Sequence, residues 1–183
     1  MPTLELKHRG NKQNRQALKI PITFFAPAER EPVKVVHRQA GSLSQTHVAR
    51  TLHNATLNYL FVLNSRRQIV MASENILKLI PGKTMDQIIG LRPGEALGCI
   101  HAGDCEGGCG TSRFCSQCGT VRVILSGLNG LRAMEECRLK RFSHGKLESL
   151  HLEVLATPMA HEDESFTLLT VADISKPTGI DIT

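Results

Sequence analysis

Five of the six cysteines in this chain fall within one short glycine-rich stretch, CIHAGDCEGGCGTSRFCSQC, which runs from Cys99 to Cys118. Thiolates gathered in this way favour a soft metal ion or redox chemistry. The glycines allow positive φ angles, so the backbone can wrap closely round a small centre. Because this composition is a poor pattern for a packed apolar core, residues 98–119, here named the cysteine segment, predict a bound centre or a redox site.

The end of the cysteine segment has the form of a metal knuckle. Cys115 and Cys118 are three positions apart and Gly119 follows, so both sulfurs can face one ion while backbone N–H groups point at sulfur. Zinc and an iron–sulfur cluster both remain open, since both use these ligands. Covalent haem is disfavoured, because glycine rather than histidine follows Cys118. A metal-free interpretation is a dithiol–disulfide pair at the start of a helix, where the helix dipole favours thiolate.

The length and composition of the chain limit the classes of protein to which it can belong. At 183 residues it can form one domain with a real core, and no window approaches the roughly 18 apolar residues of a membrane helix. The first residues are charged without a following apolar region, which argues against a secretory signal. We therefore expect a cytoplasmic protein without membrane association, whose clustered thiols act as metal ligands rather than as disulfides.

Positive charge is concentrated near the N-terminus. Residues 1–50 hold nine Lys and Arg against three Asp and Glu, whereas residues 51–183 hold thirteen against fourteen. One interpretation is an arm that binds nucleic acid or an acidic partner. The favoured one is a solvated tail, since no aromatic residues interleave with the charges to stack on bases. The basic residues concerned are chiefly Lys7, Arg9, Lys12, Arg15 and Lys19.

The order of predicted elements indicates an α+β fold. A leading helix capped by Ser42 or Ser44 is followed by a hairpin, several short helices and three more strands. The simplest arrangement is a five-stranded antiparallel sheet with helices inserted between its second and third strands. The predicted ranges are an extended segment at 17–26, helices at 42–56, 73–79, 84–89 and 121–126, and strands at 57–64, 68–72, 134–143, 150–154 and 166–174.

Several short sequence segments, in the order in which they follow one another, resemble those of a PAS sensory domain. They are LFVLN at 60–64, RQIVMASEN at 67–75, Ile89-Gly90 before the cysteine segment, and VADIS at 171–175. The resemblance implies a PAS-like sheet with short helices on one face, carrying a Cys-rich metal-binding insert at 98–119 and an N-terminal extension. The implied division is an extension at 1–41, a PAS-like domain at 42–177 and a tail at 178–183.

The cysteine segment, with GLRPGEAL at 90–97 before it and FFAPAER at 24–30, resembles a cysteine-bearing subset of bacterial PAS proteins. That resemblance implies four metal ligands, and Cys105 and Cys137 lie outside the pattern. Cys105 and His101 remain as additional or substitute ligands. The four implied ligands are Cys99, Cys109, Cys115 and Cys118.

Residues outside the cysteine segment are predicted to have structural roles. Cys137 lies on an alternating strand, which favours a packed core thiol. Arg92 and Glu95 flank Pro93-Gly94, which predicts an ion pair across that turn. The chain has no phosphate-binding glycine loop, paired-carboxylate spacing or nucleophile elbow, so no enzymatic activity is predicted.

Together these features predict a PAS-type sensory protein. Its metal centre, iron–sulfur or zinc, would sense redox, oxygen or metal state and signal through a partner protein, with a homodimer formed through the helix at 42–56. One alternative is an interaction module with a purely structural zinc site. Another is a nucleic-acid-binding regulator that uses the basic N-terminal segment. The identity of the metal, the signal, the partner and any ligand of the PAS pocket stay open.

Overall fold

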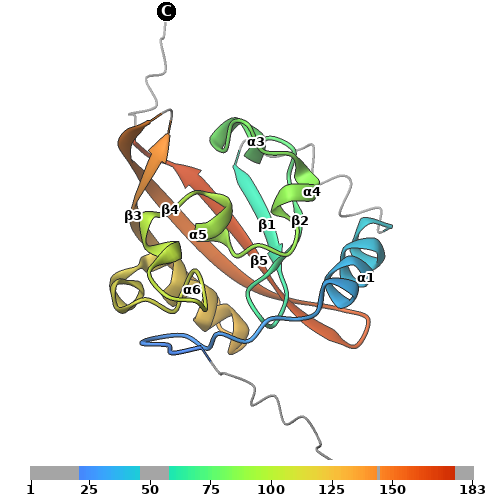
Figure 1. Ribbon diagram of the computed structural model, residues 1–183. Coiled ribbons are helices and arrows are strands. Elements are labelled where there is room, and N and C mark those ends of the chain that lie inside the picture. The colour runs from blue at the N-terminus through green and yellow to red at the C-terminus, as the bar shows by residue number, and fades with distance from the viewer. Residues whose placement is uncertain (1–20, 46–57, 144, 176–183) are drawn as a thin grey trace, which may run out of the picture.

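The fold is built on a five-stranded antiparallel sheet (Figure 1), seen in a computed structural model that describes residues 21–45, 58–143 and 145–175. The strand order is β2-β1-β5-β4-β3, so the N-terminal hairpin lies beside the last strand of the chain. This confirms the predicted five-stranded α+β architecture. The strands are β1 (Tyr59–Leu63), β2 (Ile69–Ala72), β3 (Ala133–Ser143), β4 (Lys146–His161) and β5 (Glu164–Asp173).

Alternating side chains explain why these segments pair as they do. Strand β4 buries Leu150, Leu152 and Val154 on one face, and it pairs with β3 and β5 along most of its length. Strand β1 pairs with β2 on one side and with β5 on the other. The turn between β3 and β4 includes Gly145 at φ 75°, a left-handed conformation that glycine adopts without strain.

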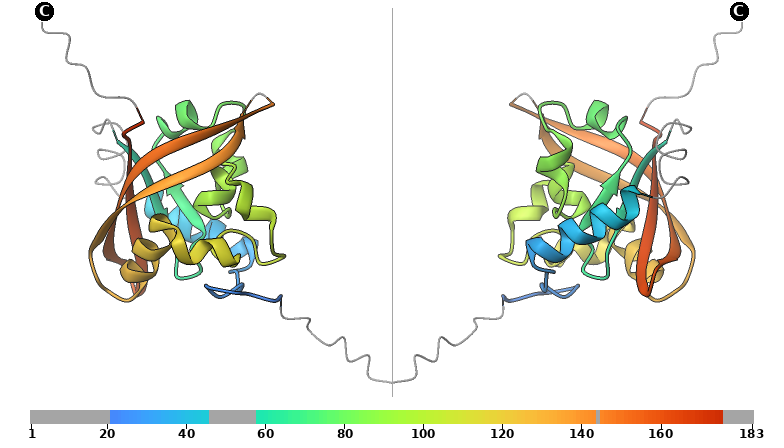
Figure 2. Two further views of the ribbon diagram at one scale, coloured as in Figure 1. Left: turned by 90° about the vertical axis from the view of Figure 1, so that its left-hand side faces the viewer. Right: turned by 90° about the vertical axis from the view of Figure 1, so that its right-hand side faces the viewer.

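Helical segments join β2 to β3 and lie on one face of the sheet (Figure 2). The core between these layers is apolar, with Phe61, Leu63 and Leu169 fully buried. Within the described residues, none of the helices is long and apolar enough to cross a membrane. The segments are α3 (Ile76–Leu79), α4 (Met85–Ile88), α5 (Pro93–Ala96), η1 (Ile100–Gly103), η2 (Arg113–Gln117) and α6 (Gly119–Leu128).

Helix α1 (Val33–Ser44) packs on the opposite face of the sheet. Its Val36 and Leu43 contact Val62, Val70 and Phe166, whose neighbours in the strands point to the other side. The fold therefore has three layers at this end, with the sheet in the middle.

Helix α1 was not predicted, and it corrects the predicted start of the helix at 42–56. The helix begins after Pro32 and ends at Ser44, so Ser42 and Ser44 close it rather than cap its start. Proline fixes a φ angle suited to a helix entry, and the buried Gln39 hides the apolar periodicity that would have revealed the helix. Residues 46–56 of the predicted helix lie outside the described residues.

The chain before α1 runs along the cysteine segment. We name residues 24–30 the N-terminal strap. The Phe24 N–H donates to the Thr111 carbonyl at 2.8 Å and the Ala26 N–H donates to the Gly110 carbonyl at 2.9 Å. The predicted extended segment is thus held by the cysteine segment rather than by the sheet, and its first residues, like the basic residues Lys7 to Lys19, lie outside the described residues.

Candidate metal centre

Five cysteines line one cavity of about 480 Å³ between the cysteine segment and β3. Its walls come from the end of α5, from η1 and η2, from the first turn of α6 and from the middle of β3. His101 and Phe114 lie at the cavity as well, with their rings stacked at a centroid distance of 4.2 Å. The five cysteines are Cys99, Cys109, Cys115, Cys118 and Cys137.

Local backbone features fix the first two cysteines. Cys99 follows Gly98, which has φ 76°, and it forms an isolated bridge to Arg141 of β3. Its N–H donates to the Gly94 carbonyl at 2.7 Å. The Cys109 N–H donates to Glu95 Oε1 at 3.0 Å. Two segments that are ten residues apart in sequence are thereby folded onto one wall.

The other three cysteines meet where α6 begins. The Cys118 N–H donates to the Cys115 carbonyl at 3.2 Å, and Cys118 is the residue that precedes the first turn of α6. Its Sγ lies 3.6 Å from Sγ of Cys137 on β3. Cys137 is buried as predicted, but it also faces the cavity, a role that the sequence did not reveal.

The predicted ligands are therefore brought together. Cys99, Cys109, Cys115 and Cys118 share the cavity, whereas Cys105 does not line it. Within the described residues, no group of three or more His, Cys, Asp or Glu side chains is arranged to hold a single metal ion. The thiols therefore lie around a cavity and are not directed at the position of one metal ion.

His101 lines the cavity and is oriented by a carboxylate. Its Nδ1 lies 2.9 Å from Oδ2 of Asp104, and that same oxygen accepts a hydrogen bond from Ser112 at 3.0 Å. These hydrogen bonds from His101 and Ser112 lower the pKa of Asp104. An imidazole held in this way by a carboxylate leaves its other nitrogen for a ligand role.

The protonation of the thiols depends on burial and on the sulfur–sulfur contact. Burial raises the pKa of Cys99, and it raises the pKa of Cys109 to about 12. The hydrogen bond between Cys118 and Cys137 raises the pKa of Cys118 and lowers that of Cys137, because one proton is shared between them. A metal would therefore have to displace protons from several of these thiols.

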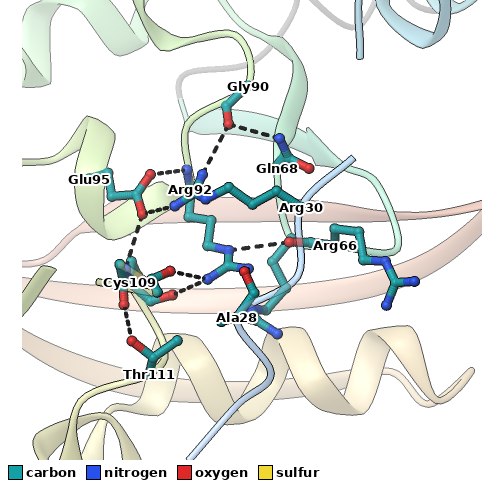
Figure 3. Close-up of polar contacts among 12 residues, drawn as sticks. Ala28, Arg30, Arg66, Gln68, Gly90, Arg92, Glu95, Cys109 and Thr111 are labelled. Atoms are coloured by element: carbon teal, nitrogen blue, oxygen red, sulfur yellow. Dashed lines mark hydrogen bonds and ion pairs between the residues drawn. The ribbon is translucent and has the colours of Figure 1, made fainter. Parts of the chain in front are cut away.

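Arg92 ties the cysteine segment to the N-terminal strap (Figure 3). Its guanidinium is 0% exposed, the largest fully buried side chain of the described residues, and it reaches carbonyls of three separate segments. They include the carbonyls of Gly107 at 2.7 Å and Cys109 at 3.2 Å, of Ala28 at 3.1 Å and Glu29 at 2.8 Å, and of Arg66 at 3.2 Å. Burial and the neighbouring Arg67 lower the pKa of Arg92 to about 10.

The predicted ion pair between Arg92 and Glu95 is wrong. Glu95 accepts the backbone N–H of Arg92 at 2.9 Å, but its ion pair is with Arg30 of the N-terminal strap. The side chain of Arg92 is instead drawn to the carbonyls because the strap and the cysteine segment close over it. Glu95 also holds Cys109, so this group connects the strap to the cavity wall.

Buried positive charge lies beside the cysteines. Arg67 is 4% exposed, and burial lowers its pKa. Its Nε has no hydrogen-bond partner. Arg67 and Arg92 together would offset the negative charge of a thiolate-bound centre.

The similarity of this chain to known proteins lies in its structure. No family model matches the sequence, and no curated protein matches it significantly. The LOV protein of Rhodobacter sphaeroides is 14% identical, with a TM-score of 0.51 over 78% of this chain and 71% of that one.

Two PAS domains give lower scores. That of BvgS from Bordetella pertussis is 17% identical, with a TM-score of 0.47 over 73% of this chain and 89% of that one. That of nitrogen regulation protein NR(II) from Vibrio parahaemolyticus is 15% identical, with a TM-score of 0.47 over 70% and 100%. The sheet order, the helices between β2 and β3, and the likeness to the LOV protein together identify the fold of this chain as that of PAS and LOV domains.

Proposed function

We propose that this chain is a PAS-type sensory module that holds an iron–sulfur cluster in the cysteine-lined cavity and reports redox or oxygen state to a partner protein. The observation that carries the proposal is the convergence of five thiols on one cavity of about 480 Å³. We assign the chain no catalytic activity. We expect it to work in a reducing compartment such as the cytoplasm, where its six free thiols persist.

The arrangement of the thiols favours a cluster over a single ion. In a tetrahedral zinc site with Zn–S bonds of about 2.3 Å, the sulfurs lie roughly 3.8 Å apart. Only a group that surrounds a point meets that requirement, and the described side chains do not form such a group of three. Cys99, Cys109, Cys115 and Cys118 would hold the cluster, and Arg67 and Arg92 would balance its charge. When bound, an iron–sulfur cluster supplies one-electron redox chemistry at a potential tuned by its surroundings.

The signal would leave the site through the N-terminal strap. Glu95 holds Cys109 and Arg30, and Arg92 bonds to the cysteine segment and to the strap at once. Three residues after the strap, α1 begins at Val33 and covers the far face of the sheet. A change in the cysteine segment would thus alter how α1 is held, and with it a surface for a partner protein or a second copy of the chain.

A second candidate function is an interaction module with structural zinc. The observation in its favour is the 3.6 Å between the sulfurs of Cys118 and Cys137, close to the spacing in a tetrahedral thiolate site. Zinc there would staple α6 to β3 without sensing. The basic-arm hypothesis depends on residues outside the described ranges, so no contact supports or opposes it.

Purification without oxygen separates the two candidates. We expect brown protein that contains iron and acid-labile sulfide, with broad visible absorbance. Cys109→Ser and Cys118→Ser should lose most of the iron, and Cys105→Ser, the matched control away from the cavity, should keep it. Colourless protein with about one zinc per chain would instead support the structural module.

The close approach of α5 to Cys109 gives a test that leaves every cysteine in place. A Cβ added at Gly94 would lie 2.6 Å from Sγ of Cys109 and 3.4 Å from Cβ of Cys99. We expect Gly94→Ala to displace the Cys109 thiol and to lower metal affinity by about tenfold or more, as disturbance of a ligand's surroundings does. Metal retention during titration with a chelator measures this.

Gly103→Ala is the matched control for that substitution. It lies in the same cysteine segment, and a Cβ there meets no atom within 4 Å. Equal metal retention in the two variants would show that Cys109 does not contribute to the site.

A further inference from the structure

The contact between Cys118 and Cys137 joins two elements that are distant in sequence. Cys118 precedes the first turn of α6, and Cys137 lies in the middle of β3, paired with Leu152 of β4. Their sulfurs are 3.6 Å apart and both line the cavity. A small oxidant that enters the cavity therefore meets both thiols together.

The backbones on either side are already held close to each other. Gly119 lies so near β3 that a Cβ added to it would fall 2.2 Å from the carbonyl oxygen of Glu136. One turn further along α6, Arg122 forms an ion pair with Glu135 of the same strand. A disulfide needs an S–S distance of about 2.0 Å and closely spaced backbones, so little movement separates this pair of thiols from a bond.

We propose that Cys118 and Cys137 form a reversible intramolecular disulfide when hydrogen peroxide reaches the cavity and no metal centre occupies Cys118. One sulfur, as thiolate, attacks a peroxide oxygen and becomes a sulfenic acid, and the departing hydroxide takes up a proton as water. The second thiol attacks that sulfur, forms the S–S bond and releases a second water. The two cysteines lose two electrons and two protons, and the peroxide is reduced to two molecules of water.

The disulfide has a consequence for the cavity. Cys118 is one of the proposed cluster ligands, so a chain with the Cys118–Cys137 bond cannot use that sulfur to hold a cluster. A thiol reductant would break the bond and return both thiols. The inference itself does not rest on the proposed function, because the pair needs no metal to react.

Peptide mapping tests the proposal on the full chain, both as purified and after removal of metal with a chelator. Trypsin cleaves after Arg113, Arg122, Arg132 and Arg138, which places Cys118 in the peptide 114–122 and Cys137 alone in the peptide 133–138. After hydrogen peroxide and alkylation of free thiols, we expect these two peptides to be cross-linked through Cys118 in the majority of metal-free molecules. The cross-link should disappear on reduction.

The same map contains the outcomes that oppose the proposal. Since the peptide 114–122 also holds Cys115, a Cys115–Cys118 disulfide would appear as that single peptide with two hydrogens lost, and it would overturn the inference. Alkylation of both Cys118 and Cys137 after peroxide treatment would do the same. The wild-type map decides the question even if a variant fails to fold.

Variants and metal analysis complete the experiment. Cys137→Ser should abolish the cross-link, and Cys105→Ser, the matched control, should leave it unchanged. Metal content is measured separately on untreated protein, so the chain can fail to bind a cluster and still form the disulfide, or the reverse. Metal content therefore tests the proposed cluster, and the peptide map tests the proposed disulfide.

Discussion

Arg92→Met is expected to lower the free energy of unfolding by about 3 kcal/mol or more, because it leaves several buried carbonyls without their donor. Methionine fills a similar volume but donates no hydrogen bond, so carbonyls of the N-terminal strap, the turn before β2 and the cysteine segment lose their shared donor. A buried carbonyl left without a partner costs about 1 to 3 kcal/mol. Urea unfolding of the full chain measures the change.

Arg38→Met is the matched control. Its side chain is 65% exposed and forms an ion pair with Glu164, a type of contact worth about 1 kcal/mol or less. Arg92→Lys refines the test, because lysine keeps the charge but lacks the planar set of five donors. If Arg92→Met and Arg38→Met lowered stability equally, the buried guanidinium would not be holding the three segments together.

The strands were predictable because apolar and polar residues alternate along them, and the apolar ones are buried. Leu150, Leu152 and Val154 alternate with polar residues, and the structure buries them against the helices. Strands β1 and β2, which lie within the predicted ranges 57–64 and 68–72, form the expected hairpin across a short polar turn. In these cases each residue's environment follows from its nearest neighbours in sequence.

Helix α1 was missed because one of its core positions is polar. Gln39 is 6% exposed, and its side chain is bonded to Asn64 at 3.1 Å as well as to Glu164. Those partners come from the β1–β2 turn and from β5, far away in sequence. A pattern based on apolar residues therefore passes over α1 and begins a helix at the serines that in fact end α1.

The cavity was predictable only in part for the same reason. The spacing of Cys115 and Cys118 and the family resemblance identified four cysteines that the structure brings together. The contact of Cys118 with Cys137 depends on how α6 lies against β3, and the role of Arg92 depends on the N-terminal strap. Both arise from tertiary packing, which local sequence does not encode.

Gly119→Ala is expected to destabilise the chain by at least about 2 kcal/mol, because overpacking a closed contact forces backbone to move. The added Cβ would lie 2.2 Å from the carbonyl oxygen of Glu136 and 3.1 Å from its carbonyl carbon. These are backbone atoms within the β3–β4 ladder, so they cannot swing aside as the end of a side chain can. Urea unfolding measures the loss.

The same substitution should also separate Cys118 from Cys137, since Gly119 directly follows Cys118 and sets its distance from β3. We therefore expect less of the Cys118–Cys137 disulfide after peroxide in Gly119→Ala than in the wild type. Gly41→Ala is the control: it lies inside α1 with nothing within 4 Å of an added Cβ, and alanine there should stabilise the helix by up to about 1 kcal/mol. Opposite signs in the two variants would locate the effect in the contact between α6 and β3, whereas a neutral Gly119→Ala with undiminished disulfide would show that this contact does not position Cys118.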